Sequence, residues 1–491
     1  MKLQELIHSF YPQEIPPKFK DLEIDSISCD SRNIHPRSLF VALQGTCSDG
    51  AEFIPQAVRQ GAVAVVRSGP APAGNTQPAH ICTLYVSDPK DFLRKLLQKF
   101  YGNLSADIRV VGITGTNGKT TISYLLESIF RAAGSRCGLI GTINYRIGDK
   151  IIPSKNTTPG IVENQSLLAE LIAEKAEYCV MEVSSHALEQ GRVDLIDFKA
   201  AVFTNLTAEH LDYHADMDGY FKAKSLLFSA LPAGSTAVIN ADDAYGKKLK
   251  SLTKAKILWY GSGGTADIRA ENLKLNFSGS TFTVKLPKGE FTVKTNLIGR
   301  HNVYNILASA GVAFSQGLPP EIIKKGVESL TVIPGRLERV DCGQDFSVFV
   351  DYAHTDDALS NVLKSLKEVC RSKIFLVFGC GGNRDRLKRP KMGKVADSLA
   401  DWSILTSDNP RNENPDDILR EISTGFVKKN YETISDRKEA IHKALSLAKA
   451  GDVVLIAGKG HEDYQIFKDQ RIHFDDREVV QNYFAQKVRA N

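Results

Sequence analysis

The sequence predicts an α/β chain of about three domains, and three observations lead to this. The chain has 491 residues, and a compact domain averages roughly 150, so about three are expected. From residue 108 onward, apolar runs alternate with helical patterns, as in parallel sheets whose strands are joined by helices. One of these runs leads directly into a glycine-rich loop, which predicts a phosphate-binding P-loop in the middle of the chain.

The first part, residues 1–102, should be a small α/β unit. The runs SLFVALQG (38–45) and GAVAVV (61–66) read as strands, and FIPQAVRQ (53–60) as a helix between them. The stretch Ser68–Ala79 is rich in Gly, Pro and Asn and predicts a loop.

The middle part, residues 103–334, begins with the buried strand IRVVGITG (108–115) and a helix over Thr120–Ala133 that ends near Gly134. The runs AEYCVMEVSS (176–185) and KAAVFTNL (199–206) predict further strands. The stretch Leu273–Val293 alternates apolar and polar residues, which favours a small antiparallel excursion.

A boundary near Pro334–Gly335 precedes the last part, residues 335–491. Four apolar runs there end in polar residues or glycine: FSVFVDYAH (346–354), KIFLVFGCGG (373–382), WSILTSDNP (402–410) and DVVLIAGKG (452–460). In open parallel sheets, ligands bind at the carboxyl ends of the strands. A substrate pocket is therefore expected at that edge.

Composition excludes several classes of protein. A net charge of +5 without a long Lys/Arg run argues against nucleic-acid binding. No apolar run approaches the ~20 residues of a membrane helix, and the start lacks a signal peptide, so we expect a cytoplasmic protein without membrane contact. The eight cysteines form no CxxC pair, which favours buried thiols in a reducing compartment.

The run GTNGKTT (115–121) lies between a strand and a helix, where a phosphate loop belongs. Its backbone N–H groups would face phosphate oxygens, Lys119 would reach the β/γ-phosphates of ATP, and Thr120 would bind Mg²⁺. Ile113 stands where the usual pattern has its first glycine. The alternative is a chance glycine turn with a lysine cap.

Two residues after the neighbouring strands could join this site. Glu182 lies near the end of the run YCVMEV and suits Mg²⁺, which prefers oxygen ligands; the alternative is a helix-capping acid. His210, in TNLTAEHLDYH (204–214), is by itself better explained as a surface or capping histidine.

Many further motifs occur in one order along the chain: DSR (30–32), LFVALQGTCSDG (39–50), NTTP (156–159), EVSSHALEQGR (182–192), YFKAKSLLF (220–228), GRHNVYN (299–305), IPGRLE (333–338), DYAHT (351–355), GCGGNRDRLKRPKMG (379–393), DNPR (408–411) and GKGHEDYQ (458–465). Together with GTNGKTT they resemble the Mur ligases, ATP-dependent amino-acid ligases of peptidoglycan precursor synthesis. That family's shorter loop, GTxGK[ST], explains Ile113.

The resemblance implies three domains. Residues 1–102 would bind the UDP end of the substrate, residues 103–334 would bind ATP, and residues 335–491 would form a Rossmann-like domain that brings the amino acid. The pattern is most similar to the branch of the family that adds the third peptide residue to UDP-MurNAc-L-Ala-D-Glu, through an acyl phosphate. A monomer is expected.

The resemblance also implies roles for individual residues. Lys119, Glu182, His210 and Lys224 would be catalytic, with Thr120 and Glu182 on one Mg²⁺ and His210 on a second. Lys224 would be carbamylated and so become an anionic oxygen donor, whereas without the family it reads as a solvated helix lysine. ATP would also contact Gly115, Thr116, Asn117, Gly118, Thr121, Asn302 and Arg336, with Asp351 and His354 near the nucleotide. The UDP-linked substrate would contact Ser31, Asn156, Thr157, Thr158, Ser184, Gln190 and Arg192.

The acceptor in this branch is meso-diaminopimelate or lysine. Diaminopimelate carries a second carboxylate, which the planar fork of an arginine can bind with two parallel hydrogen bonds. Arg384 and the intact DNPR run favour diaminopimelate, and the implied contacts are Arg384, Asp408, Asn409, Pro410, Arg411, Gly458 and Glu462. L-lysine stays the alternative acceptor.

Three residues depart from the family pattern: Asn383 and Asn414 replace acids, and Asp356 replaces a proline. The first bears on the local geometry around Arg384.

Other readings are a folylpolyglutamate-synthase-like ligase, a P-loop switch or motor ATPase, and a paralogue that only binds nucleotide. The DSR-containing first domain and DNPR speak against the first of these, and the intact Lys119, Glu182, His210 and Lys224 against the last.

Overall fold

The computed structural model describes residues 1–45, 48–70 and 81–490. The described residues therefore leave out two positions of the 39–50 motif, one of which is Cys47. They also leave out most of the predicted loop Ser68–Ala79. By its internal contacts the chain divides into two units. The first contains Met1–Val110, Thr158–Cys179 and His186–Asp197, and the second contains Val111–Thr157, Val180–Ser185 and Phe198–Asn491. The predicted division at residues 102 and 334 stays a prediction.

The first unit contains a four-stranded parallel sheet in the order β1-β2-β3-β4. Its strands are β1 (Ser26–Ser28), β2 (Ser38–Val41), β3 (Ala62–Ser68) and β4 (Cys82–Val86). Its helices are α1 (Leu3–Ile7), α2 (Ile54–Arg59), α3 (Pro89–Tyr101), α5 (Ile161–Ala173) and the short turns Pro17–Phe19, Gly50–Phe53 and Leu104–Ala106. Alternate strand residues face two apolar layers, one with α1 and α3 and the other with α2. This confirms the predicted strands and helix of residues 38–66.

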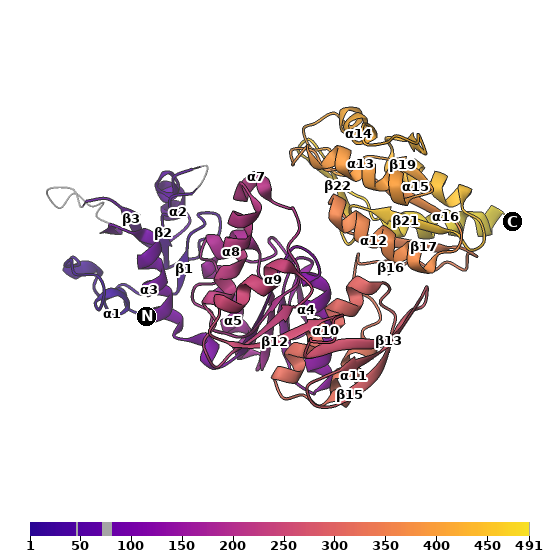
Figure 1. Ribbon diagram of the computed structural model, residues 1–491. Coiled ribbons are helices and arrows are strands. Elements are labelled where there is room, and N and C mark those ends of the chain that lie inside the picture. The colour runs from indigo at the N-terminus through magenta and orange to yellow at the C-terminus, as the bar shows by residue number, and fades with distance from the viewer. Residues whose placement is uncertain (46–47, 71–80, 491) are drawn as a thin grey trace. The chain divides into compact units, whose positions relative to one another are not determined.

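A sheet of eleven strands lies in the middle of the sequence, in the order β15-β14-β13-β12-β11-β10-β5-β9-β6-β7-β8. Its strands β12, β13 and β15 are labelled in Figure 1. Its first six strands in the sequence are β5 (Arg109–Thr114), β6 (Cys137–Ile140), β7 (Asn144–Ile147), β8 (Lys150–Pro153), β9 (Tyr178–Glu182) and β10 (Phe198–Phe203). The other five are β11 (Thr236–Asn240), β12 (Lys256–Gly261), β13 (Ile268–Asn276), β14 (Gly279–Lys285) and β15 (Glu290–Thr295).

Both ends of this sheet are antiparallel. β13, β14 and β15 form the predicted excursion, and β6, β7 and β8 form a second one that the sequence analysis did not identify. The helices of this part are α4 (Lys119–Ala132), α7 (Leu211–His214), α8 (Met217–Ser229), α9 (Ala244–Lys248), the turn Leu249–Ser251, α10 (Arg300–Ser315) and α11 (Pro320–Ser329). The short helix α6 (Ser185–Glu189) begins at the last residue of its stretch in the second unit and otherwise belongs to the first. α4 packs against α10 and α11, and its bounds lie within one residue of the prediction.

The last part of the chain contains a six-stranded sheet in the order β16-β17-β21-β18-β19-β20. Its strands are β16 (Glu338–Arg339), β17 (Ser347–Asp351), β18 (Ile374–Phe378), β19 (Trp402–Leu405), β20 (Tyr431–Thr433) and β21 (Val453–Ala457). All pairs from β17 to β20 are parallel, so the four predicted runs do end at one edge. The hairpin β22 (Tyr464–Phe467) and β23 (Gln470–His473) follows β21.

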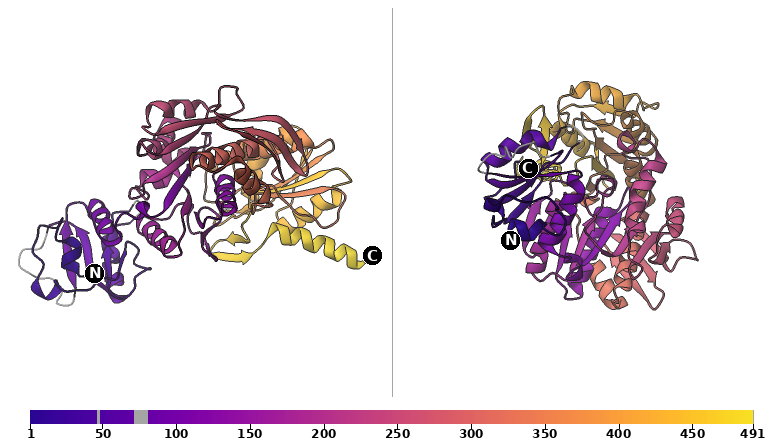
Figure 2. Two further views of the ribbon diagram at one scale, coloured as in Figure 1. Left: turned by 90° about the horizontal axis from the view of Figure 1, so that it is seen from below. Right: turned by 90° about the vertical axis from the view of Figure 1, so that its left-hand side faces the viewer.

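Helices cover both faces of this sheet because successive strand residues point to opposite sides. Phe349 belongs to the layer under α12 (Asp356–Val369), α13 (Lys388–Leu399) and α14 (Pro415–Ser423). Its neighbours Val348 and Val350 belong to the layer under α15 (Arg437–Leu447) and α16 (Asp476–Ala490). α16 is the yellow helix at the C-terminus in Figure 2. The α/β class predicted from the sequence is confirmed.

Candidate active site

The phosphate loop lies between β5 and α4, and its two glycines are required by its shape. Gly115 and Gly118 have φ of +142° and +92°, values that favour glycine. A Cβ at Gly115 would lie 1.8 Å from Thr204 Oγ1, and one at Gly118 would lie 2.5 Å from Asn305 Oδ1. The loop therefore fits against its neighbours only with glycine at both positions.

Lys119 folds back over this loop. Its Nζ donates to the carbonyl oxygens of Gly115 and Thr116, at 2.9 and 2.8 Å. Burial lowers the pKa of Lys119, although Glu209 and Glu182 act to raise it. A partly buried cation held by two loop carbonyls is well placed to turn to phosphate oxygens.

Thr120 and Glu182 meet inside the site, although they are far apart in the sequence. Thr120 Oγ1 donates to Glu182 Oε2 at 3.0 Å, and Arg336 Nη2 donates to Thr120 Oγ1 at 3.1 Å. The side chain of Glu182 is also fixed by Thr142, whose N–H and Oγ1 both donate to it at 2.9 Å. The structure thus brings three predicted residues together and adds Thr142.

Lys224 lies on α8 and is 2 % exposed. Its Nζ donates to the carbonyl oxygen of Gly115 at 2.8 Å and lies 4.6 Å from the centre of the Tyr220 ring. Burial lowers its pKa well below the usual lysine value, and the positive charge of Lys119 adds to this effect. Lys224 is therefore a buried amine at the phosphate loop, which the sequence without the family did not predict.

Glu209 is a residue that the sequence analysis missed. It lies 3.8 Å from His210 Nε2 and 3.9 Å from His354 Nε2. Burial acts to raise the pKa of Glu209, but the charges of His210, Lys119, His354 and Lys224 together lower it below its usual range. Its place beside His210 in TNLTAEHLDYH was the available signal.

Other predicted nucleotide contacts are held by local hydrogen bonds. Asn302 is buried, donates to Ile298 O at 2.9 Å and accepts from Asn305 Nδ2 at 3.0 Å. Asp351 accepts the N–H groups of Leu337 and Ala353, at 2.7 and 2.8 Å. These bonds fix the side chain of Asn302 on α10 and that of Asp351 at the end of β17.

Asn117 and Asp357 form a link that the sequence did not predict. Asn117 Nδ2 and Thr207 Oγ1 donate to Asp357 Oδ2, at 2.7 and 2.9 Å. Asp357 belongs to the first turn of α12, directly after the departure Asp356. This carboxylate joins the start of α12 to the phosphate loop.

The predicted contacts of the UDP-linked substrate divide between the two units. Within the first unit, Arg192 donates to Gln190 Oε1 and to Thr158 O, at 2.7 and 2.9 Å, and the buried Ser31 donates to Gln56 at 3.0 Å. Within the second unit, Thr157 Oγ1 lies 3.1 Å from Thr142 Oγ1, and Tyr145 donates to Asn156 O at 2.8 Å. Ser184 follows β9 in the second unit.

The predicted amino-acid contacts gather at the carboxyl edge of the last sheet. Asn409 Nδ2 donates to Glu462 Oε2 at 2.9 Å. Gly458 has a φ of +108° and lies against Asp408, whose Oδ2 would be only 2.7 Å from a Cβ at that position. The fully buried Lys459, which was not predicted, lies 3.3 Å from Glu462 Oε2 and donates to Asn409 Oδ1 at 3.4 Å.

Charge in this cluster is mixed. Burial acts to raise the pKa of Asp408, but Lys459 and Arg437 lower it below its usual range. Burial raises the pKa of Glu462, and Asp408 adds to that effect. The cluster therefore offers carboxylates to an ammonium group.

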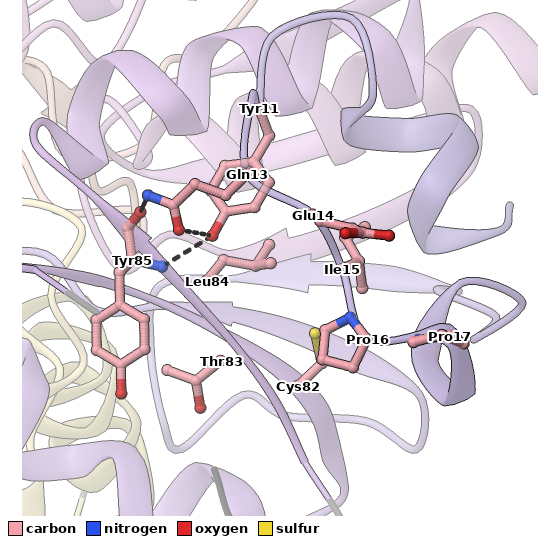
Figure 3. Close-up of a pocket in the computed structure, with 10 residues that line it drawn as sticks. All are labelled: Tyr11, Gln13, Glu14, Ile15, Pro16, Pro17, Cys82, Thr83, Leu84 and Tyr85. Carbon is pink, nitrogen blue, oxygen red and sulfur yellow. Dashed lines mark hydrogen bonds between the residues drawn. The ribbon is translucent and has the colours of Figure 1, made fainter. Parts of the chain in front are cut away.

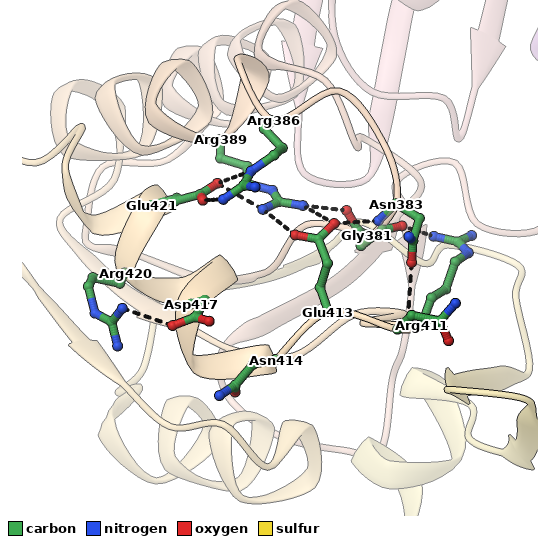
Figure 4. A network of polar contacts seen from close by, with 12 residues as sticks. Gly381, Asn383, Arg386, Arg389, Arg411, Glu413, Asn414, Asp417, Arg420 and Glu421 are labelled. Atoms are coloured by element: carbon green, nitrogen blue, oxygen red, sulfur yellow. Dashed lines mark hydrogen bonds and ion pairs between the residues drawn. The ribbon is translucent and has the colours of Figure 1, made fainter.

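Arg384 and Arg411 flank Gly381 in the same region. A Cβ on Gly381 would lie 2.9 Å from Arg411 Nη1 and 3.8 Å from Arg384 Cγ. Arg411 and Asn383, the departure beside Arg384, are shown in Figure 4, while Pro410 precedes Arg411 in the turn. The two predicted arginines are thus neighbours, and Arg384 is exposed.

Comparison with known proteins identifies the family. Models of the Mur ligase family match at residues 23–101 (Mur ligase family, catalytic domain), 113–313 (Mur ligase middle domain) and 335–460 (Mur ligase, glutamate ligase domain). The chain is 44% identical over 509 aligned positions to a UDP-N-acetylmuramoyl-L-alanyl-D-glutamate--2,6-diaminopimelate ligase of Geobacter metallireducens, with 99% of each chain covered. The chain belongs to the Mur ligase family.

Two further relatives agree with this membership. An enzyme of the same name from Bacillus licheniformis is 45% identical over 488 positions, with 98% of each chain covered. A solved structure, titled as a UDP-N-acetylmuramoyl-L-alanyl-D-glutamate--2,6-diaminopimelate ligase, is 33% identical, covers 99% of both chains and has a TM-score of 0.68. Membership of the Mur ligases confirms the prediction of a ligase, whereas the individual site residues stay predictions.

A pocket of about 320 Å³ lies in the first unit of this Mur ligase, between β4 and residues 11–17 (Figure 3). Tyr11, Gln13 and Tyr85 line it and are joined by hydrogen bonds. None of the predicted site residues lines it. None of the seven cysteines among the described residues belongs to a disulfide. A search of the same residues for a helix with the length and apolarity of a membrane span finds none.

Proposed function

We propose that this Mur ligase adds meso-2,6-diaminopimelate to UDP-MurNAc-L-Ala-D-Glu at the expense of ATP, in the cytoplasm. The observation that carries the choice of acceptor is the mixed charge at the carboxyl edge of the last sheet. The carboxylates of Asp408 and Glu462 and the guanidinium of Arg411 all lie close enough to Tyr464 to act on its pKa. A distal ammonium and a distal carboxylate need one partner of each sign, and the full-length relatives named for this reaction support the same choice.

The chemistry is a carboxyl activation followed by an acyl transfer. A carboxylate oxygen of the D-Glu residue attacks the γ-phosphorus of ATP, and ADP leaves. The amine of the acceptor then attacks the acyl carbon, inorganic phosphate leaves with the C–O bond electrons, and the amine loses a proton. Such steps depend mainly on positioning and charge neutralisation.

Lys119 and the loop amides would hold the phosphates. Turning of the Lys119 ammonium from Gly115 O and Thr116 O to a phosphate would exchange two carbonyl partners for an anion, a stronger hydrogen-bond acceptor. The Arg336 guanidinium, 4.9 Å from the Tyr352 ring and bonded to Thr120, would supply a second positive charge.

The oxygens of Thr120 and Glu182 fit Mg²⁺. They lie 3.0 Å apart, close to the ~3 Å between adjacent oxygens of an octahedron with Mg–O distances of about 2.1 Å. His210 would serve a second ion, although among the described residues no group of three or more His, Cys, Asp or Glu side chains forms a metal site by itself. When bound, Mg²⁺ would neutralise phosphate charge; the chain's part is to hold the oxygens in place.

Carbamylation of Lys224 is supported by its environment. Only a neutral amine adds CO₂, and burial lowers the pKa of Lys224 and so favours that form. The carbamate would replace one of two neighbouring cations at Gly115 O by an anion that can bind metal. The roles of this residue and of His210 remain part of the proposal.

The test is an assay of phosphate release with UDP-MurNAc-L-Ala-D-Glu, ATP and Mg²⁺. Diaminopimelate, L-lysine, or no acceptor would be supplied in parallel, and the product would be identified by mass. Release that depends on diaminopimelate is expected. Release with lysine alone would assign the other acceptor, and release without any acceptor would favour a switch or motor ATPase; either result would refute the proposal.

A further inference from the structure

The loops that carry Arg384 and Arg411 are joined through their backbones. The N–H of Gly382 donates to Asn409 O at 2.9 Å, and Arg411 Nη1 donates to Gly382 O at 2.9 Å. Gly382 is required here, since a Cβ would lie 1.9 Å from Pro410 O. The Arg411 side chain is therefore directed by the position of the neighbouring loop.

Asn383 adds two more bonds between these loops (Figure 4). Its Oδ1 accepts the N–H of Asn412 at 3.1 Å, and its own N–H donates to Glu413 Oε1. Its φ is +53°, a left-handed conformation that asparagine tolerates better than most residues. Asparagine in place of the family's acid thus keeps an acceptor oxygen and suits the backbone.

Glu413 connects this pair of loops to a buried cation. Arg389 on α13 is 0% exposed and donates to both carboxylate oxygens of Glu413, at 2.9 Å each. Arg389 also donates to Glu421 at 2.8 Å and to Gly381 O at 3.4 Å. A bidentate pair of this kind fixes direction as well as distance.

The backbone of Arg411 is held from the other side by the β22–β23 hairpin. Its N–H donates to Ile466 O at 3.0 Å, and its carbonyl accepts from Lys468 N–H at 2.7 Å. Its φ of +53° is uncommon for a residue with a side chain. Within the described residues, both hydrogen bonds of the Arg411 side chain use Nη1, which leaves Nε and Nη2 for a carboxylate.

We propose that Glu413 is a positioning residue for acceptor selection. Clamped by Arg389, it holds the loop of Asn383 against the turn of Arg411 and so fixes the direction of the guanidinium that meets the distal carboxylate. The inference rests on the proposed function and deepens it, because it concerns the recognition of an acceptor that carries that carboxylate. Glu413 acts through Arg411 and touches no reacting atom.

The first test compares Glu413→Gln with the wild-type chain in steady-state kinetics. Glutamine keeps an oxygen for Asn383 N–H but loses the charge that holds Arg389. The KM for diaminopimelate should rise about tenfold or more, since small misplacement of a binding group has large effects. The kcat and the KM values for ATP and UDP-MurNAc-L-Ala-D-Glu should stay within about twofold, as expected for a loss of acceptor binding alone. Asp417→Asn is the matched control, because it removes the carboxylate of an exposed pair with Arg420 in the same region.

A double-mutant cycle tests whether Glu413 acts through Arg411. The pair Arg411→Ala and Glu413→Gln should be no worse than Arg411→Ala alone, because residues that share one function are not additive. Additive losses, an unchanged KM for diaminopimelate in Glu413→Gln, or an equal rise in the KM for ATP would each overturn the inference.

A second pair of variants, at Asn383, distinguishes a loss of positioning from a folding defect, because it leaves the buried Arg389 and its partners intact. Asn383→Gly keeps the left-handed backbone but removes the bond to Asn412, and it should raise the KM for diaminopimelate. Asn383→Asp keeps an acceptor oxygen and should behave as wild type; equal kinetics for both would contradict the inference. If the wild-type chain releases no phosphate in response to diaminopimelate, the proposed function itself fails, and this is visible before any variant is compared.

Discussion

Lys224 Nζ lies 2.8 Å from the carbonyl oxygen of Gly115, the first residue of the phosphate loop. The same oxygen accepts from Lys119 at 2.9 Å. Two lysines on one carbonyl place two positive charges side by side in a buried site, which is unfavourable unless one is neutral or an anion joins them. The proposed carbamate on Lys224, together with bound phosphates, would remove this unfavourable pairing of charges.

Removal of the Lys224 side chain should abolish ligation, and a small acid should restore part of it. Lys224→Ala is expected to lower kcat at least 100-fold, since a group that stabilises developing charge is lost. Formate or acetate would occupy the space and supply carboxylate oxygens. Lys222→Ala, an exposed lysine on the same helix, is the control. Full activity of Lys224→Ala without added acid would exclude the carbamate role.

Glu182 should set the dependence on Mg²⁺. Glu182→Gln keeps an oxygen for the Thr142 N–H but loses the negative charge, so the Mg²⁺ concentration for half-maximal rate should rise about tenfold or more. Chelation by EDTA should abolish activity of the wild-type chain, and added Mg²⁺ should restore it. An unchanged Mg²⁺ titration in the variant would remove Glu182 from the metal site.

Arg411 should decide between acceptors. Arg411→Ala is expected to lower kcat/KM for diaminopimelate roughly 100-fold, the effect of leaving a carboxylate without its charged partner. Arg411→Lys should recover little, because an ammonium lacks the planar fork. Activity with lysine should change less, and competition between the two amino acids in one reaction would measure the ratio. A proportional loss for both acceptors would contradict this role.

The buried pair of Arg437 and Asp476 should stabilise the last part of the chain. Arg437 donates to both oxygens of Asp476 at 2.7 Å and to Ala457 O at 3.1 Å. Asp476→Asn should cost about 3–5 kcal/mol, because an uncompensated charge would remain buried.

Fluorescence can report this loss locally. The chain has two tryptophans, and Trp402 lies in β19, so urea unfolding in a Trp259→Phe background follows the last sheet. Asp417→Asn, which breaks an exposed pair with Arg420, should change the free energy of unfolding by no more than about 1 kcal/mol. Equal effects of the two substitutions would be evidence against the buried pair.

His301 should make stability sensitive to acid. Burial lowers its pKa from 6.5 to about 4, so its contribution is complete above pH 6.5. As the pH falls from 6.5 towards 4, the unfolded chain binds the proton before the folded chain does, and stability is lost. His301→Gln should therefore show a shallower fall of unfolding free energy over this interval, measured by urea titration at each pH. Parallel curves for variant and wild type would assign the acid sensitivity elsewhere.

Strands with strong apolar runs were predictable from the sequence. FSVFVDYAH became β17 and IRVVGITG became β5 because a strand buried on both faces needs uninterrupted apolar residues. β7 and β8 were not predicted, since NYRI and KIIP are short and partly exposed. Polar residues interrupt or flank the apolar residues of β7 and β8, so neither segment gave a long continuous apolar run.

Part of the candidate site could be predicted from short motifs whose residue types indicate one kind of chemistry. GTNGKTT and DNPR are such motifs, and the residues within each motif lie close to one another in the structure. The contacts of Asp357 with Asn117, and of Arg389 with Glu413, join residues that are distant in the sequence. No local pattern encodes such partners, because hydrogen bonds between loops depend on how strands are ordered in the sheet.

The first unit has a consequence for biosynthesis, since it is assembled from three separate stretches of chain. Ile161, Val162 and Leu195, from the second and third stretches, pack on the apolar layer of residues 3–97. That layer cannot be fully covered until the ribosome has delivered residue 197. At about 5–20 residues per second, translation of the roughly 100 residues in between leaves it partly open for about 5–20 seconds, an interval in which a chaperone that recognises apolar surface can bind the nascent chain.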